Sequence, residues 1–165
     1  MNALEEMILE VDYKDMIVAF IDEDVRFLLI GGRAVGAYGY PRATKDLDLW
    51  VWANPENSVR VIKALEKFGA PMDHISAKDF AKEGTIFQIG VAPVRIDIIT
   101  ATVGVTFEEA HSNLVIMEID GLKIPVISLT DLIKNKKAAG RQRDLNDVQH
   151  LEKILEIKSR NIKRR

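Results

Sequence analysis

The feature that most constrains the fold is a segment at residues 27–52, where two glycines separate a short apolar run from an alternating one. The apolar run, Phe27–Ile30, predicts a buried strand. The later run, Asp46–Trp52, alternates aliphatic side chains with acidic and aromatic ones, which is typical of a second strand. Because side chains alternate along a strand, Asp46 and Asp48 must lie on one face, a few ångströms apart.

Both helices and strands are predicted around this segment. The first two dozen residues favour helix, with a break near Asp12. The other predicted elements are a short helix at 34–38, a helix at 55–68 burying Ile62, Leu65 and Phe68, strands at 86–91, 94–100, 114–119 and 122–126, a helix from Ser128 to Gly140, and a last amphipathic helix through Leu145, Val148, Leu151 and Leu155. Asp120-Gly121 is a two-residue hairpin signal and requires antiparallel pairing. We therefore expect an α/β or α+β fold with a mixed sheet, not a doubly wound parallel sheet.

Composition excludes several classes of protein. The chain has 165 residues and no cysteine, so disulfides, cysteine-bound zinc and thiolate catalysis are ruled out. Its apolar runs are shorter than the ~20 residues that a membrane helix requires. The acidic residues near the N-terminus do not resemble a signal peptide. We expect one domain over residues 1–157 that is located in the cytoplasm and binds no membrane.

Charge is unevenly distributed along the chain. The formal net charge is −2, but residues 158–165 hold five of the 23 basic residues and no acid. The other 157 residues carry 18 basic and 25 acidic residues, a net charge of −7. The basic C-terminal tail, residues 158–165, is therefore either a contact for nucleic acid or a solvated chain end.

Asp46 and Asp48 are the first candidates for chemistry. Two carboxylates this close repel each other unless one is protonated or a cation lies between them. Oxygen ligands favour a hard ion such as Mg²⁺ or Mn²⁺. Gly31 and Gly32 let backbone N–H groups approach an anion closely, so phosphate and metal would fit the same corner. The structural alternative for Asp46 and Asp48 is a solvated strand edge, and for Gly31 and Gly32 it is a tight turn.

The pattern of apolar strand, Gly31-Gly32, thirteen residues and then Asp-Leu-Asp-Leu resembles the signature of the nucleotidyltransferase superfamily that includes DNA polymerase beta. The resemblance implies a nucleotidyltransferase fold, glycines under the nucleotide phosphates, and an aspartate pair that binds two Mg²⁺ ions with a third carboxylate. Asp97, between isoleucines in a predicted strand, is the candidate for that third carboxylate. A salt bridge with Arg95 is the alternative, since an unpaired carboxylate there would be costly.

Finer matches resemble a small prokaryotic branch related to abortive-infection and toxin–antitoxin nucleotidyltransferases. They are the segment Pro-Arg-Ala-Thr-Lys-Asp-Leu-Asp at 41–48 and the segment from Lys137 to Val148. The expected nucleotide-binding residues are Gly31, Gly32, Arg33, Arg42, Thr44, Lys137 and Arg141. Lys137 and Arg141 would share a helical face only if the helix continued through Gly140. Asp144 and Asp147 either orient Arg141 or cap and solvate the last helix, and the structural role is favoured. Trp50 and Trp52 either stack on a base or are partly buried, and burial is favoured.

The resemblance implies a metal-dependent enzyme that transfers a nucleoside monophosphate from a nucleoside triphosphate, with ATP as the expected nucleotide, to an acceptor hydroxyl. Asp46, Asp48 and Asp97 would be its catalytic and metal-binding residues. The acceptor stays open among an RNA 3′ end, a protein hydroxyl and a small molecule such as an aminoglycoside. A homodimer or a partner protein is expected to complete the acceptor cleft.

Two alternatives to an enzyme stay open. One is a non-catalytic domain of the same fold that binds a nucleotide or a partner, as an antitoxin or a sensor does. The other is a nucleic-acid-binding module that acts through residues 158–165.

Overall fold

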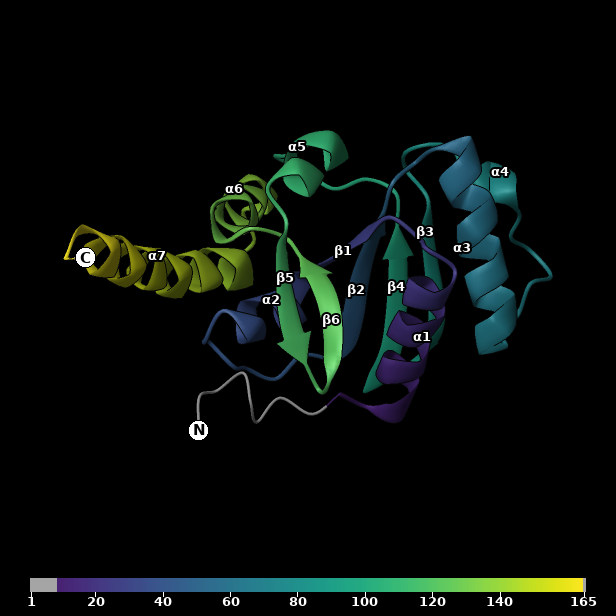
Figure 1. Cartoon of the computed structure of the whole chain (residues 1–165), viewed down its shortest axis with the longest axis horizontal. Coiled ribbons are helices and arrows are strands. Elements are labelled where there is room, and N and C mark those ends of the chain that lie inside the picture. The colour runs from purple at the N-terminus through teal and green to yellow at the C-terminus, as the bar shows by residue number, and fades with distance from the viewer. Residues whose placement is uncertain (1–8, 165) are drawn as a thin grey trace.

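The computed structural model describes residues 9–164, which form a mixed six-stranded sheet with helices around it (Figure 1). The strands are β1 (Phe27–Ile30), β2 (Asp46–Val51), β3 (Ile86–Val91), β4 (Val94–Ile99), β5 (Val115–Ile119) and β6 (Leu122–Val126). The helices are α1 (Val11–Asp22), α2 (Gly31–Ala37), α3 (Pro55–Phe68), α4 (Ala77–Phe80), α5 (Phe107–Ser112), α6 (Leu129–Ala139) and α7 (Gln142–Lys163). The predicted fold class is confirmed.

The sheet has the strand order β3-β4-β2-β1-β6-β5. Its pairs β1–β2, β3–β4 and β5–β6 are antiparallel, while β2–β4 and β1–β6 are parallel. The β5–β6 hairpin turns at Asp120-Gly121, as predicted. In the parallel pair, Asp48 lies directly opposite Asp97, so two predicted site residues are neighbours across the strands.

Helix α3 shows how local sequence sets element boundaries. The Asn54 side chain accepts hydrogen bonds from the backbone N–H groups of Glu56 and Asn57, and Gly69 ends the helix in the left-handed conformation. The predicted bounds are therefore confirmed. The buried stripe is only partly as predicted: Leu65 is buried, but Ile62 and Phe68 are half-buried, and Val61 and Ala64 complete the buried face.

The N-terminal prediction needs a correction. Helix α1 begins at Val11 and runs without interruption to Asp22, so there is no break at Asp12. Asp12 instead lies in the first turn, where a carboxylate is favourable beside unpaired N–H groups. The part of the predicted helix before residue 9 lies outside the described residues.

Two short helices, α4 and α5, were not expected, and α2 begins earlier than the predicted 34–38. Helix α2 starts at Gly31, immediately after β1, so both glycines belong to its first turn. Helix α5 packs Phe107 against the buried Trp50 ring, with the centroids 5.3 Å apart. Burial of Trp50 is thus confirmed, and this ring is not placed to stack on a base.

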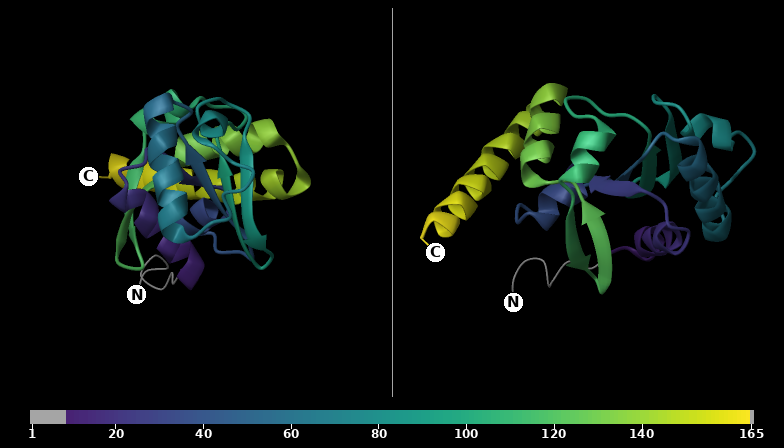
Figure 2. Two further views of the ribbon diagram at one scale, coloured as in Figure 1. Left: turned by 90° about the vertical axis from the view of Figure 1, so that its right-hand side faces the viewer. Right: turned by 45° about the horizontal axis from the view of Figure 1, so that its top comes forward.

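Helices α3 and α4 lie by β3 and β4, and α6 and α7 lie at the other end of the sheet (Figure 1). Helix α7 projects away from the body along its second half (Figure 2). Residues 158–163 of the basic tail are the last turns of this helix, and their side chains are exposed. No helix within residues 9–164 combines the length and apolarity needed to cross a membrane.

Candidate active site

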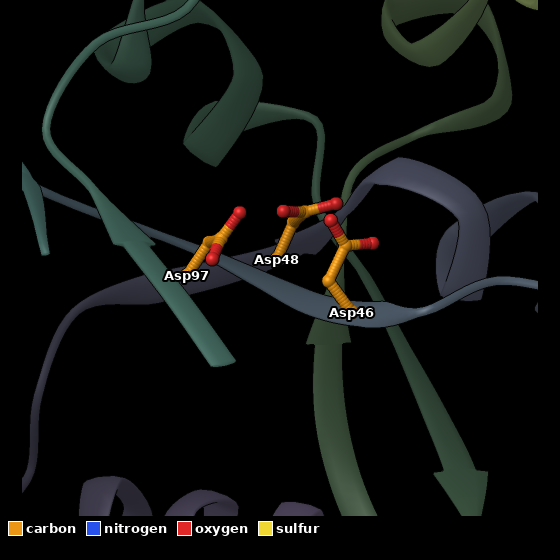
Figure 3. A group of neighbouring side chains, drawn as sticks. All are labelled: Asp46, Asp48 and Asp97. Atoms are coloured by element: carbon orange, nitrogen blue, oxygen red, sulfur yellow. The ribbon is translucent and has the colours of Figure 1, made fainter. Parts of the chain in front are cut away.

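Three carboxylates from two adjacent strands form one cluster. Asp46 and Asp48 project from the same side of β2, and Asp97 faces them from β4 (Figure 3). One oxygen of each carboxylate lies within 4.8 Å of the others. The period of two along β2 and the parallel register with β4 produce this arrangement. The predicted meeting of Asp97 with the aspartate pair is therefore observed.

The cluster is electrostatically strained without a cation. Burial, together with the nearby charges of Asp46 and Asp97, raises the pKa of Asp48 to about 7. Within residues 9–164, no hydrogen bond reaches the Asp48 carboxylate. Three carboxylates with no histidine among them form a donor set suited to a hard divalent cation such as Mg²⁺ or Mn²⁺. The residues present therefore fit the metal that the sequence predicts.

Arg95 holds two of the three carboxylates in place. Its Nε donates to Asp97 Oδ1 at 3.0 Å, and its Nη2 donates to Asp46 Oδ2 at 2.8 Å. Thr44 Oγ1 donates to the other Asp46 oxygen at 3.2 Å. Both interpretations of Asp97 are thus realised together, because it pairs with Arg95 and also joins the cluster.

Gly31 and Gly32 allow the backbone to pass close to the cluster. Gly31 has φ +71°, and a Cβ added there would lie 2.1 Å from Asp48 Oδ2. A Cβ on Gly32 would lie 2.8 Å from Thr44 Oγ1. No side chain fits either place without displacing a residue of the site.

We expect Gly31→Ala to impair metal binding more than it impairs folding. The new methyl must push the Asp48 carboxylate aside, and the positive φ adds backbone strain of about 1–3 kcal/mol. Isothermal titration with Mn²⁺ should show at least a tenfold weaker affinity. Gly39→Ala is the matched control, since Gly39 also has positive φ but its added Cβ meets nothing within 4 Å. Equal affinities in the two variants would contradict the expectation.

A cavity of about 160 Å³ adjoins the carboxylates and is lined by four cationic side chains. These are Arg42, Lys136, Arg141 and Arg143. The predicted site residues that line it are Gly31, Gly32, Arg42, Thr44, Asp46, Asp48 and Arg141. The site thus combines a carboxylate cluster with a cationic cavity, which is the charge pattern that a metal-bound polyphosphate requires.

Two buried aspartates of α7 hold three of these cations, Arg42, Lys136 and Arg141. Asp147 accepts two hydrogen bonds from Arg42, each of 2.8 Å, and lies 3.2 Å from Lys136 Nζ. Asp144 accepts from Arg141 Nε at 2.7 Å and from Lys136 Nζ at 3.3 Å. Burial acts to raise the pKa of both carboxyls, but the bonds from these cations outweigh it and lower both. Asp144 belongs to the capping box at the start of α7 and also orients Arg141, so both alternatives hold for it. Asp147 holds Arg42 and Lys136, and neither aspartate is solvated as expected, because both are buried.

The structure places Lys137 outside the cavity. Gly140 adopts the left-handed conformation and ends α6, so Lys137 and Arg141 are not on one continuous helix. Lys137 is exposed and pairs with Glu152 at 2.7 Å. Its neighbour Lys136 is 5% exposed and lines the cavity instead. The burial of Lys136 could have been predicted from sequence, because Lys136 continues the helical spacing of Leu129, Leu132 and Ile133 on the buried face of α6.

Arg33 and Trp52 also lie away from the cavity. The Arg33 guanidinium lies 5.0 Å from the centre of the Tyr13 ring, on the α1 side of the sheet. Trp52 is half-buried; Arg26 covers its ring, and its Nε1 donates to Glu108. Neither residue is brought together with the three carboxylates.

Comparisons with known proteins identify a family and similar folds. Residues 10–165 match the family described as "Nucleotidyl transferase of unknown function (DUF2204)". No curated protein matches the chain.

Several solved structures share the fold. The lincosamide antibiotic adenylyltransferase LnuA, with lincomycin bound, is 17% identical, with a TM-score of 0.61 over 90% of this chain and 99% of that one. ANT(2")-Ia in complex with adenylyl-2"-tobramycin is 15% identical, with a TM-score of 0.57 over 92% and 95% of the chains. A nucleotidyltransferase-like protein from Paracoccidioides brasiliensis is 14% identical, with a TM-score of 0.53 over 90% and 76%.

The family match covers nearly the whole described chain, and the similar structures carry the same fold. The relation to abortive-infection and toxin–antitoxin proteins stays a prediction. The chain belongs to the nucleotidyl transferase family DUF2204.

Proposed function

We propose that this protein is a metal-dependent nucleotidyltransferase that moves a nucleoside monophosphate from a nucleoside triphosphate to an acceptor hydroxyl and releases pyrophosphate. The observation that carries the proposal is the contact between two charge clusters of opposite sign. Asp46, Asp48 and Asp97 lie within 4.8 Å of one another, and Asp46 and Asp48 also line the cationic cavity. A protein that only bound a partner would have no need of this costly arrangement.

The carboxylates would hold Mg²⁺ or Mn²⁺. When bound, the metal neutralises phosphate charge and polarises the reacting phosphorus. Arg95 and Thr44 fix the orientation of Asp46, and Arg95 fixes that of Asp97. Asp97 is the group that helps to remove the proton from the attacking hydroxyl.

The cationic cavity would hold the triphosphate. Backbone N–H groups of Gly31 and Gly32 face the phosphates, as do the side chains of Arg42 and Lys136. Thr44 and Arg141 complete the set of proposed phosphate contacts. Since Asp144 and Asp147 hold these cations in place, little side-chain entropy remains to be lost when the nucleotide binds.

Transfer would follow an in-line displacement. The acceptor oxygen forms a bond to the α-phosphorus as the bond from that phosphorus to the β-phosphate oxygen breaks. The cations of the cavity take up the negative charge that accumulates on the departing pyrophosphate. ATP is the expected nucleotide, and two similar structures, an adenylyltransferase and a complex with an adenylylated antibiotic, support this expectation.

Thermal unfolding with each of ATP, GTP, CTP and UTP, with and without Mg²⁺, tests the nucleotide half of the proposal. A nucleotide at a hundred times its Kd stabilises by about 2.7 kcal/mol, and each kcal/mol raises the Tm of a chain this long by roughly 2–4 °C. We expect a shift that needs both nucleotide and metal. It should disappear in Asp97→Asn and persist in Asp73→Asn, a change at an exposed carboxylate that does not line the cavity.

Release of pyrophosphate tests the catalytic half. A metal-dependent shift without pyrophosphate release, with RNA, protein and small-molecule acceptors all supplied, would favour the non-catalytic alternative. The absence of a metal-dependent shift with all four nucleotides would overturn the proposal.

A further inference from the structure

A second and larger cavity, of about 440 Å³, adjoins the first one. It lies where β2 and β4 begin, beside the turn at Ala92-Pro93 that joins β3 to β4. Thr44, Asp46 and Arg143 line both cavities. Its volume is within the roughly 300–1,000 Å³ typical of small-molecule sites. The two cavities therefore meet at a carboxylate of the cluster. The proposed triphosphate site does not occupy the second cavity.

The second cavity is lined by three cations and one acid. Lys45 and Arg143 are exposed, and neither forms an ion pair within residues 9–164. Arg95, the third cation, is paired with Asp46 and Asp97. The acid is Asp46, whose charge is already shared with Arg95 and, in the proposed function, with the metal. The open part of the cavity is thus positively charged.

We infer that this second cavity is the acceptor subsite and that it takes a phosphate-bearing acceptor, in which the attacking hydroxyl belongs to a nucleotide or to the 3′ end of a nucleic acid strand. The inference rests on the proposed function, since it names the substrate class of the same site. In an in-line displacement the acceptor must approach from the side opposite the leaving pyrophosphate. The second cavity adjoins the triphosphate cavity at Asp46 and borders Arg95 beside Asp97, so an acceptor held there would lie next to the carboxylates of the proposed reaction.

The charge of the cavity decides against a cationic acceptor. Lys45 and Arg143 would each form a charge-assisted bond to a phosphate. The same side chains would repel a polyamine such as an aminoglycoside, because like charges brought together in a partly enclosed site are unfavourable. A neutral protein hydroxyl would gain nothing from either cation.

The test uses the full chain and reads equilibrium binding, so it does not depend on turnover. Fluorescence anisotropy is measured with a labelled single-stranded oligoribonucleotide, and unlabelled AMP and tobramycin serve as competitors. We expect binding that weakens with salt. If AMP competes at concentrations near the Kd of the oligoribonucleotide, the acceptor is nucleotide-sized. If the oligoribonucleotide binds much more tightly than AMP, the acceptor is a strand end.

Lys45→Glu is the decisive variant because Lys45 lines only the second cavity. We expect at least a tenfold loss of oligoribonucleotide affinity, with the Mg²⁺-dependent nucleotide shift unchanged. Lys63→Glu, the same reversal at an exposed lysine on α3, should bind as the unmodified protein does. If the acceptor were cationic, Lys45→Glu would instead raise affinity, and tobramycin would bind this variant more tightly than the unmodified protein.

Each outcome separates this inference from the proposed function. Three results, each with an intact nucleotide shift, would overturn the acceptor assignment alone. The first is binding of tobramycin, and the second is the absence of both RNA and AMP binding. The third is equal RNA binding by Lys45→Glu and Lys63→Glu. Loss of the nucleotide shift in the unmodified protein overturns the proposed function itself.

Discussion

Asp48→Asn is expected to unfold at a higher temperature than the unmodified protein at pH 8 and to lose nucleotidyl transfer. Burial and the charges of Asp46 and Asp97 raise the pKa of Asp48 to about 7. Above that pH the ionised carboxylate destabilises the metal-free fold, by roughly 4 kcal/mol at most when 1.36 kcal/mol is counted for each pKa unit. An uncharged amide removes this repulsion and also removes a metal ligand.

The pH dependence has a definite sign. Because the pKa of Asp48 is raised in the folded state from its ordinary value of 3.8, the folded protein binds more protons than the unfolded chain between about pH 4 and 7. Stability of the metal-free protein therefore falls as pH rises through that range, so far as Asp48 contributes. The advantage of Asp48→Asn should be small near pH 4, grow through this range and level off above pH 7.

Chemical denaturation in the presence of a chelator, at steps of pH from 5 to 8, measures this difference directly. Asp73→Asn, at an exposed carboxylate, should follow the unmodified protein at every pH. Adding Mg²⁺ should stabilise the unmodified protein and leave Asp48→Asn unchanged. A variant that is less stable than the unmodified protein at pH 8, or one that still transfers nucleotides, would be inconsistent with the role given to Asp48.

Asp147→Asn is expected to have the opposite effect on stability. Asp147 is 1% exposed and holds Arg42 through two bonds and Lys136 through one ion pair. Losing its charge leaves two partly buried cations undercompensated, which typically costs 3–5 kcal/mol. The Tm should fall by on the order of 10 °C, and nucleotide affinity should weaken because Arg42 is no longer held at the cavity.

The control for Asp147→Asn is Asp22→Asn, which breaks the exposed pair between Asp22 and Lys67. Exposed pairs contribute about 0–1 kcal/mol, so this variant should be nearly unchanged in calorimetry. If the two variants melted at the same temperature, the buried network would not stabilise the protein as described.

The parts of the site that lie on single strands could be predicted from sequence. Alternation placed Asp46 and Asp48 on one face, and the isoleucines around Asp97 marked a buried strand. Local rules also located α3, the β5–β6 hairpin and the end of α6 at Gly140. These features depend on contacts a few residues apart, which periodicity and capping residues describe well.

The missed parts depend on contacts between distant elements. The apolar spacing of α6 indicates that Lys136 is buried, but the sequence does not show that α7 folds back against α6, so its pairing with Asp144 and Asp147 could not be predicted. The link between Arg42 and Asp147 spans 105 positions of the chain, beyond the reach of any local pattern. For the same reason, no periodicity indicated that Arg95 would bridge two strands.

The projecting second half of α7 makes this protein convenient for single-position labelling. The chain contains no cysteine, so a cysteine introduced on that helix would be the one thiol available to a maleimide dye. Ser159 is exposed, and at a rise of 1.5 Å per residue it lies about 18 Å along the helix from Asp147. A dye at Ser159→Cys would therefore report on complexes formed at the cavities without touching them.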